Sequence, residues 1–183
     1  YNPLSLNKVK LDNKTINIVD INYNEPLKFT KINSKSKKYI TNCFETSFKI
    51  LKYGITDKFI NGPISKTSFL KKKFLGITEY LEKKTGAKKS AMLIYNKKLS
   101  VCPITTHMPL KSVAKNISKK KIIEKVILIN NFYKKIMGFS PKIALLGLNP
   151  HCESVDKFNE DIKVIKPSIK YLSKNKINIK GPY

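Results

Sequence analysis

The sequence predicts a layered α/β protein that is incomplete at both ends. Segments with helical periodicity alternate along the chain with strand-like apolar segments, and this alternation favours helices layered on a sheet. Hydrophobic residues make up 41% of the 183 residues, enough for one substantial core. The chain begins with Tyr1 and ends with Tyr183 directly after a strand-like run, so we expect a piece of a longer protein.

In the first half of the chain, short strands are predicted to alternate with helices. The helical segments carry apolar residues at helical spacing, whereas β-branched residues mark the strands. The predicted strands are residues 15–21 and 58–60, the predicted helices are residues 38–53, 67–74 and 78–84, and residues 22–36 form a predicted polar loop. Gly54 and Gly86 follow two of these helices, as glycine often does at a helix C-terminus. A Gly-Pro turn before Lys66 places that lysine at a helix start.

A hairpin and the clearest helix of the chain come next. Residues 90–95 and 99–105 are β-rich and flank a polar triplet, which predicts an antiparallel hairpin. Ser118 is the predicted N-cap of the helix, which ends at Gly138. The apolar positions of this helix form one buried stripe, made of Ile122, Val126, Ile129, Tyr133 and Ile136.

The last third of the chain predicts a strand, a helix and a further strand. Residues 142–148 are continuously apolar, which is typical of a strand buried on both faces. A helix is predicted over residues 159–173, with Pro167 inside it or kinking it, and another strand begins at residues 177–179.

The net charge of +25 raises the question of nucleic-acid binding. All 37 basic residues are lysine, however, and bidentate recognition of guanine and phosphate relies mostly on arginine. The lysines are spread along a chain that is also rich in Ile and Asn, a pattern typical of AT-rich coding. We therefore expect solvated lysine faces, non-specific attraction to polyanions at low salt, and no specific nucleic-acid partner.

Cysteine usage and hydropathy indicate the compartment. Three cysteines without a CxxC spacing predict neither a disulfide framework nor a zinc knuckle. No apolar run approaches 18 residues and no signal-peptide pattern opens the sequence, so we expect no membrane span. These features predict a cytoplasmic protein.

Two histidines are the strongest indication of function. His107 lies in Thr-Thr-His-Met-Pro-Leu and His151 in Gly-Leu-Asn-Pro-His-Cys, each after an apolar run. Because strand ends in an α/β sheet meet at one edge, the two imidazoles are candidates for a metal or catalytic site. The alternative is an ordinary, partly buried and hydrogen-bonded imidazole at each position. Imidazole suits Zn²⁺ and similar ions, but a catalytic site needs about three protein ligands, so two histidines are not a complete set.

Other residues offer weaker indications. Cys152 is a possible third ligand or thiolate nucleophile, although a small packing residue is the more ordinary interpretation. Thr78 follows a glycine at a predicted helix start, where it would bind an anion or simply cap the helix. Lys66 would bind phosphate as a point charge. Neither a GxGxxG nor a GxxxxGK[ST] motif occurs, so no nucleotide fingerprint is present.

Taken together, the motifs resemble those of the 4-hydroxythreonine-4-phosphate dehydrogenase family of pyridoxal phosphate biosynthesis. That family has, in order, Gly-Pro-Ile-x-Lys, Gly-His-Thr-Glu, Thr-Thr-His-x-Pro-Leu and Gly-Leu-Asn-Pro-His segments. The corresponding segments here are Gly62 to Lys66, Gly76 to Glu79, Thr105 to Leu110 and Gly147 to His151. Their order and separations agree across residues 60–183, and the last two motifs are specific.

The resemblance implies an isocitrate/isopropylmalate dehydrogenase-like α/β/α fold, of which residues 1–183 are the central part of a larger two-subdomain enzyme. It implies a homodimer with active sites at the subunit interface. The implied reaction is the NAD- or NADP-dependent oxidation of 4-phosphooxy-L-threonine, a small phosphorylated amino acid, followed by decarboxylation to 3-amino-2-oxopropyl phosphate. A divalent metal (Zn, Mg or Co) is held in the family by three histidines, and His107 and His151 match two of them.

The sequence also departs from the family. The substrate-binding His-Thr pair becomes Ile77-Thr78, so that only Thr78 carries over, and Lys66 matches the lysine of the first motif. The third metal histidine and most dinucleotide contacts are expected beyond Tyr183, and the opening strand and loop of the family are missing, so we expect this piece to be inactive alone. Three alternatives stay open: a related dehydrogenase of another phosphorylated hydroxy acid, a metal or Cys-His hydrolase, and a basic nucleic-acid-binding module.

Overall fold

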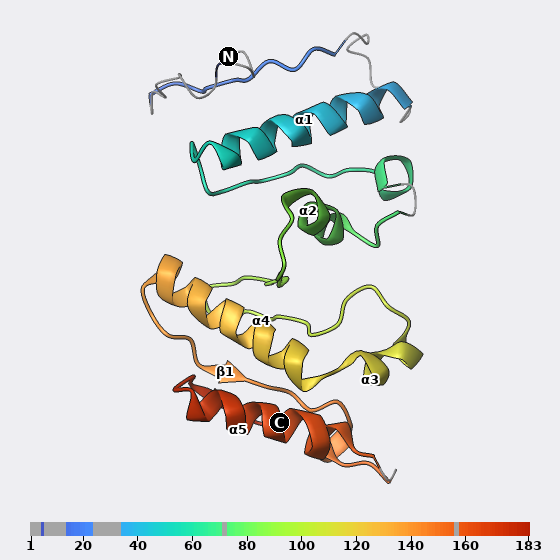
Figure 1. Cartoon of the computed structure of the whole chain (residues 1–183), viewed down its shortest axis with the longest axis vertical. Helices are drawn as coiled ribbons and strands as arrows, with labels where there is room; N and C mark the ends of the chain where they lie inside the picture. Colours follow the sequence, from blue (N-terminus) through green and yellow to red (C-terminus); the bar gives the residue numbers. More distant parts are fainter. Residues whose placement is uncertain (1–4, 6–13, 24–33, 71–72, 156–157) are drawn as a thin grey trace. The chain divides into compact units, whose positions relative to one another are not determined.

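The computed structural model describes residues 5, 14–23, 34–70, 73–155 and 158–183. The chain divides into two compact units, Tyr1–Leu81 and Glu82–Tyr183. Figure 1 shows the elements of both in chain order.

The first unit is helical in its described part. Its elements are α1 (Ser34–Lys52), the π-helical turn η2 (Lys66–Leu70) and the start of α2 (Ile77–Thr85), which continues into the second unit. The helix predicted over 38–53 is confirmed as α1, and the one predicted over 78–84 as α2. Gly54 and Gly86 follow these helices with φ +70° and +67°, the left-handed conformation in which glycine has no steric penalty.

Aromatic side chains form the core of the first unit. Phe44 from α1 stacks on Phe69 from η2 with 5.4 Å between ring centroids, and Tyr80 from α2 meets both rings edge-on. Offset and edge-to-face pairs of this kind contribute roughly 0.5–1.5 kcal/mol beyond their burial. Burial also raises the pKa of the Tyr80 phenol, with a smaller contribution from the nearby negative charge of Glu45.

The second unit contains helices packed around a short parallel strand pair. Its remaining elements are η3 (Leu110–Ser112), α3 (Val113–Asn116), α4 (Lys119–Phe132), η4 (Tyr133–Met137), β1 (Ile143–Ala144), η5 (Pro150–Cys152), η6 (Asp161–Ile165), α5 (Lys166–Lys174) and β2 (Ile179–Lys180). As predicted, Ser118 caps α4, where its Oγ accepts a hydrogen bond from the Lys121 amide at 3.3 Å. Gly138 ends the helical run at φ +77°.

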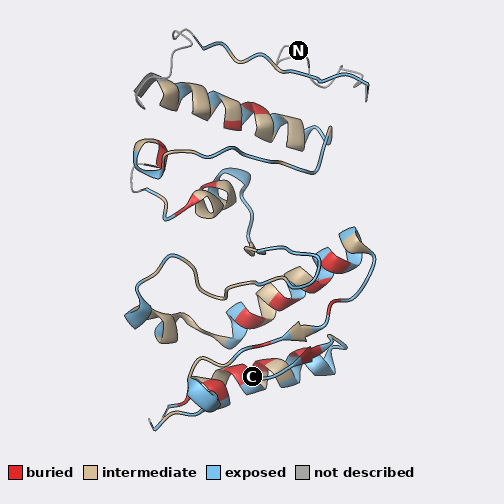
Figure 2. Cartoon of the chain, turned by 180° about the vertical axis from the view of Figure 1, so that it is seen from behind, coloured by how far each residue is buried: buried red, intermediate tan, exposed pale blue. Residues whose placement is uncertain are grey.

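β1 and β2 pair in parallel, with Ile143 opposite Ile179, and the η6–α5 helical segment connects them. A parallel pair needs such a crossover, so this segment is a βαβ unit. Figure 1 shows β1 lying between α4 and α5, and Figure 2 shows the buried residues along these three elements. An aliphatic core joins them, made of Ile122, Val126, Leu145, Ile165, Leu172 and Ile179.

Several strand predictions are wrong. Residues 15–21 and 58–60 are not strands, and Ile16 (90% exposed) and Ile60 (94%) face solvent. Within the described part of the chain, neither segment has a neighbouring strand with which to form a ladder, and β-propensity without a partner does not make a strand. The predicted hairpin of residues 90–95 and 99–105 is reduced to one antiparallel bridge, between Ile94 and Val101.

The remaining predictions are confirmed in part. Within 142–148 only β1 is a strand, and Leu146 is 68% exposed, so the segment is not buried on both faces. The helix of 159–173 appears as η6 followed directly by α5, with Pro167 as the second residue of α5, where the π-helical segment passes into the α-helix. Of the helix predicted over 67–74, η2 is observed, and residues 71–72 lie outside the described part, as do residues 24–33 of the predicted loop. In that loop, α1 already begins at Ser34.

Among the described residues, no helix combines the length and the apolar character that crossing a membrane requires.

Candidate functional site

His151 lies at an exposed turn beyond β1. The turn η5 is closed by hydrogen bonds from the Cys152 amide to the Asn149 carbonyl (3.0 Å) and from the Glu153 amide to the Pro150 carbonyl (3.1 Å). His151 has φ 56° and Cys152 has φ 57°. Non-glycine residues adopt this left-handed region rarely, and such residues are concentrated at functional sites.

A buried carboxylate holds the segment before this turn. Asp161, which is 0% exposed, accepts hydrogen bonds from the Leu148 amide on Oδ1 (2.8 Å) and from the Asn149 amide on Oδ2 (3.1 Å). The Asn149 side-chain amide donates a third bond to Oδ2 (2.9 Å). Hydrogen bonds to a carboxylate are stronger than neutral ones, so Asp161 fixes these two residues to the start of η6.

The C-terminal residues hold the same segment from the β-sheet side. The Leu145 amide donates to the Lys180 carbonyl (2.9 Å), and the Gly147 amide donates to the Tyr183 carbonyl (2.9 Å). Tyr183 returns a bond from its amide to the Leu145 carbonyl (3.2 Å). The hydrogen bonding of the β1–β2 pair therefore continues to within four residues of His151 (147 to 151).

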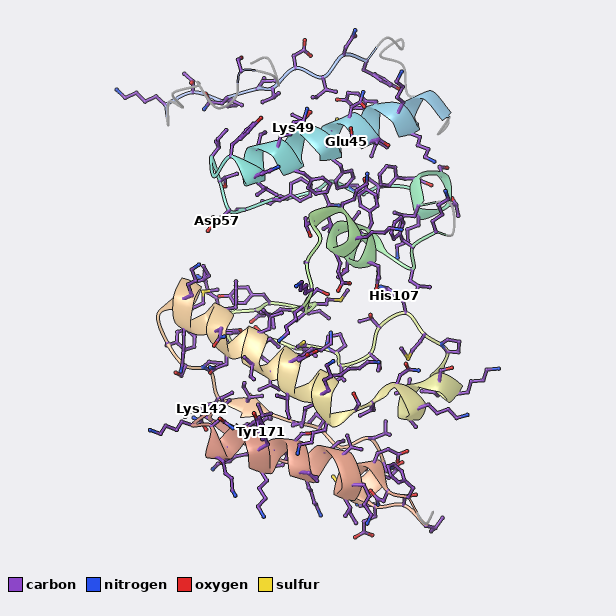
Figure 3. The ribbon with its side chains drawn as sticks, in the orientation of Figure 1. Glu45, Lys49, Asp57, His107, Lys142 and Tyr171 are labelled. Atoms are coloured by element: carbon purple, nitrogen blue, oxygen red, sulfur yellow. The ribbon has the colours of Figure 1, made fainter. Side chains whose placement is uncertain are left out.

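His107 occupies a second exposed turn, shown in Figure 3 on the loop before η3. Its φ of 52° places it in the same left-handed region as His151. Neither imidazole has a hydrogen-bond partner among the described residues, and both are exposed. The structure thus does not show the partly buried, hydrogen-bonded histidine that was the ordinary alternative at either position.

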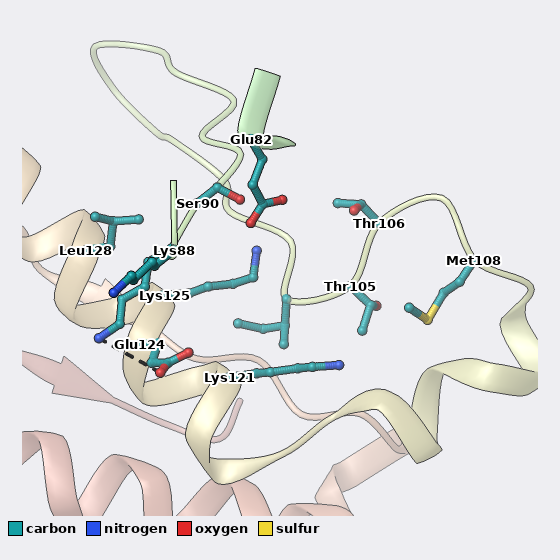
Figure 4. Close-up of a pocket in the computed structure, with 12 residues that line it drawn as sticks. Glu82, Lys88, Ser90, Thr105, Thr106, Met108, Lys121, Glu124, Lys125 and Leu128 are labelled. Atoms are coloured by element: carbon teal, nitrogen blue, oxygen red, sulfur yellow. Dashed lines mark ion pairs between the residues drawn. The ribbon is translucent and has the colours of Figure 1, made fainter. Parts of the chain in front are cut away.

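A pocket of about 280 Å³ adjoins the His107 motif. Thr105, Thr106 and Met108 line one side of it, and Figure 4 shows the side chains of Lys121 and Lys125 extending from α4 toward that side. Its charged lining residues are four lysines and two glutamates: Lys88, Lys89, Lys121, Lys125, Glu82 and Glu124. One pair is partly neutralised, since Lys89 Nζ lies 3.9 Å from a Glu124 carboxylate oxygen. The excess of lysines makes the pocket suited to an anionic ligand.

Cys102 lies near this pocket on the strand-like segment that precedes His107. Burial raises the pKa of its thiol, and the nearby Lys125 ammonium lowers it by a smaller amount. The thiol therefore stays protonated and weakly nucleophilic near neutral pH. Cys152, beside His151, is partly buried, and its sulfur lies in the space next to Gly147, where an added Cβ would approach it to 2.6 Å.

The substrate-binding candidates lie in the first unit. Lys66 is exposed at the start of η2, and Thr78 is half-buried in the first turn of α2. Ile77 packs against the aromatic core, which gives a physical role to the isoleucine that stands where the resembled family has histidine. Next to Thr78, one carboxylate oxygen of Glu79 is buried without a hydrogen-bond partner among the described residues.

The structure thus brings His107 and His151 into one unit and places Lys66 and Thr78 in the other. Among the described residues, no three His, Cys, Asp or Glu side chains gather as a metal-binding group. The described part of the chain therefore provides two candidate imidazole ligands, which is fewer than the three protein ligands that a catalytic metal site needs. Sequence reasoning missed Asp161, because its partners lie 12 and 13 residues away and no local pattern marks an acidic residue as buried.

The chain is similar to known proteins over most of its length. It is 46% identical over 130 residues to 4-hydroxythreonine-4-phosphate dehydrogenase from Sulfurihydrogenibium sp., covering 69% of this chain and 40% of that protein. It is 28% identical over 173 residues to D-threonate 4-phosphate dehydrogenase from Pectobacterium atrosepticum, covering 91% of this chain and 53% of that protein. The chain thus spans about half or less of the length of these curated relatives.

A solved structure has a similar fold. The crystal structure of 4-hydroxythreonine-4-phosphate dehydrogenase from Klebsiella pneumoniae superposes with a TM-score of 0.72 at 23% identity, over 83% of this chain and 48% of that one. At this identity the likeness shows the fold alone, and it agrees with the α/β class predicted from the sequence. The model of one protein family matches residues 2–183. The chain therefore belongs to the family described as pyridoxal phosphate biosynthetic protein PdxA.

Proposed function

We propose that this chain is part of an NAD- or NADP-dependent, divalent-metal-dependent dehydrogenase that oxidises 4-phosphooxy-L-threonine in pyridoxal phosphate biosynthesis, with decarboxylation to 3-amino-2-oxopropyl phosphate. The observation that carries the proposal is the family match over residues 2–183, a range that contains both histidine motifs. The chain spans only part of its relatives, so activity belongs to the full-length gene product.

In this proposal His107 and His151 hold the metal ion (Zn²⁺, Mg²⁺ or Co²⁺) through their imidazole nitrogens. Two features support the assignment: both side chains are exposed, and neither has a hydrogen-bond partner among the described residues. A bound divalent ion would act as a Lewis acid on the substrate oxygens. The third ligand is expected from a histidine beyond Tyr183.

The other residues bind and orient the substrate. The lysine-rich pocket beside Thr105 and Thr106 would attract a phosphorylated anion toward His107. Thr78 would donate its hydroxyl to the substrate, and Lys66 would pair with its phosphate. The proposed enzyme is a cytoplasmic homodimer, and three free cysteines fit a reducing compartment.

The test is to assay the full-length gene product for reduction of NAD⁺ or NADP⁺ with 4-phosphooxy-L-threonine, with and without divalent metal. We expect turnover that a chelator abolishes and that added metal restores. His107→Ala and His151→Ala should each lower kcat/KM by at least about a hundredfold, because each removes a ligand of the catalytic ion. Metal-independent turnover in both variants would contradict the proposal.

A related dehydrogenase of another phosphorylated hydroxy acid is the second candidate. It is favoured by Ile77, an apolar core residue where the family resemblance calls for a substrate-binding histidine, and by the similarity to D-threonate 4-phosphate dehydrogenase over 91% of the chain. Comparing kcat/KM for 4-phosphooxy-L-threonine and D-threonate 4-phosphate decides between the two. A preference for the second substrate of tenfold or more, equivalent to about 1.4 kcal/mol, would replace the first proposal with this one.

A further inference from the structure

The segment that leads to His151 is held by a side chain outside the histidine motif. Both oxygens of Asp161 accept hydrogen bonds from Leu148 and Asn149, at 2.8–3.1 Å. A fully buried carboxylate is costly unless such donors satisfy it, so the segment and Asp161 stabilise each other.

Little conformational freedom remains between this attachment and His151. Asn149 is tied to Asp161, Pro150 has its φ restricted by its ring, and the bond from the Cys152 amide to the Asn149 carbonyl closes the turn. The direction in which the His151 side chain leaves the backbone therefore depends on where Asp161 holds Asn149.

Asp161 itself lies on a rigid support. It begins η6, and η6 continues into α5, whose Leu172 is buried in the aliphatic core together with Ile165 of η6. Functional side chains held by packed helices are positioned more precisely than those on free loops.

We propose that Asp161 is the positioning residue of the metal site: it holds the His151 turn in the conformation that presents the imidazole to the ion. This inference rests on the proposed function, because it assumes that His151 is a ligand. In this role Asp161 contacts neither metal nor substrate and acts through its hydrogen bonds to the Leu148 amide and to the amide and side chain of Asn149.

The decisive experiment measures Co²⁺ binding to the metal-free, full-length gene product by visible absorption, without substrate or dinucleotide. Asp161→Asn keeps the shape of the side chain but replaces an acceptor oxygen by a donor. We expect Co²⁺ affinity to fall about tenfold to a hundredfold, the range found when groups that orient metal ligands are changed. Amide hydrogen exchange at Leu148 and Asn149 should accelerate in the same variant.

Two matched controls come from the same helical segment. Asn159 caps its start by accepting a bond from the Ile162 amide (3.1 Å), and Ser168 is fully buried and donates to the Val164 carbonyl (2.7 Å). Among the described residues, neither side chain makes a hydrogen bond to the His151 turn. Asn159→Ala and Ser168→Ala should lower stability yet leave Co²⁺ affinity within about twofold of the unmodified protein, since ligand orientation is untouched.

The outcomes separate this inference from the proposed function. If His151→Ala weakens Co²⁺ binding but Asp161→Asn does not, the positioning role is overturned and the metal site stands. If His107→Ala and His151→Ala both retain full affinity, the metal site itself is wrong. If Asp161→Asn does not fold, Asn149→Ala decides, because it removes the 2.9 Å side-chain bond to Asp161, together with a longer one to Glu160 (3.5 Å), and leaves the backbone bonds in place. We expect a loss of roughly threefold to tenfold, and unchanged affinity would overturn the inference.

Discussion

The two histidine turns share a backbone conformation but differ in how the protein holds them. The His151 turn is fixed on one side by Asp161 and on the other by hydrogen bonds that continue the β1–β2 pair. In the His107 loop, by contrast, the backbone of residues 104–108 makes no hydrogen bond to any described residue. Ile104 packs on the aliphatic core at the start of that loop, and the ring of Pro109 restricts the backbone at its end.

This difference teaches how a site with ligands on two loops can be both precise and adaptable. A preorganised ligand lowers the entropic cost of binding, because little ordering remains to be done when the ion arrives. A second ligand on a loosely held loop can adjust its position to the ion. Its loop then loses conformational entropy when the ion binds, which lowers the affinity. We therefore expect His151 to define the geometry of the proposed site and His107 to complete it.

The largest loss of stability should follow from disrupting the hydrogen bonds between the Leu145–Gly147 segment and the C-terminal residues, which hold the His151 turn on one side. Gly181 has φ +135°, and a Cβ added there would collide with the Leu145 carbonyl. Gly181→Ala should lower the free energy of unfolding by about 3–5 kcal/mol. Gly138→Ala, at φ +77° with open space around it, is the matched control and should cost about 1 kcal/mol. Urea unfolding of both variants measures the difference, and equal losses would mean that the strand pairing contributes little.

A smaller effect is expected inside the turn itself. A Cβ on Gly147 would lie 2.6 Å from the Cys152 sulfur and 3.1 Å from an Asp161 oxygen. Gly147→Ala should therefore cost about 1–3 kcal/mol, as overpacking does. Gly62→Ala, which meets nothing within 4 Å, should change stability by less than about 0.5 kcal/mol. Thermal unfolding compares the two, and a neutral Gly147→Ala would show that the His151 turn is as adaptable as the His107 loop.

On the segment that leads to His107, a substitution should lower the free energy of unfolding by a still smaller amount. Tyr133 in η4 shares a 2.9 Å hydrogen bond between its hydroxyl and Ser100 Oγ, on the segment that leads to His107. Tyr133→Phe should cost about 1 kcal/mol, the net value of one such bond. Tyr171→Phe, at a partly exposed ring, serves as the control and should be nearly neutral. A loss above about 3 kcal/mol for Tyr133→Phe would show that the His107 segment is held far more firmly than we infer.

The most sensitive comparison needs no substitution. Amide hydrogen exchange of the unmodified protein should be at least about tenfold slower at Leu148 and Asn149 than at Thr105 and Thr106, because only the first pair donates to a protein acceptor. Measurement by nuclear magnetic resonance resolves the four amides. Equal exchange rates would remove the distinction between the two turns.

Helices were predictable from the sequence because their signals are local. Ser118 and Gly138 gave both ends of the helical run correctly, whereas the burial predicted for Ile136, the last member of the predicted buried stripe, is wrong, because this side chain is 48% exposed in the final turn. Strands depend on partners elsewhere in the chain. Residues 15–21 have an alternating pattern but pair with no strand in the described structure, and in 142–148 only Ile143 and Ala144 are in register with β2.

The same difference between local and long-range signals decides which parts of the candidate site could be predicted. Both histidines were found from their motifs, yet their left-handed turns were not foreseen, because the sequence predicted strand ends rather than turn conformations. Asp161 was missed since a single acidic residue in a helix usually faces solvent. Its burial follows from packing of η6 beside the Leu148–Asn149 backbone, an arrangement between segments that no short window of sequence contains.

The left-handed backbone at both histidines also bears on how these positions tolerate mutation. One base change at the first codon position converts histidine into asparagine. Asparagine adopts the left-handed backbone conformation more often than most other non-glycine residues. In an AT-rich gene, mutation toward the asparagine codon is favoured, and the substitution would leave the backbone of both turns intact. Folding alone therefore gives no protection to either imidazole. A genetic selection for folded protein should let asparagine accumulate at both positions, whereas a selection for the proposed activity should remove it.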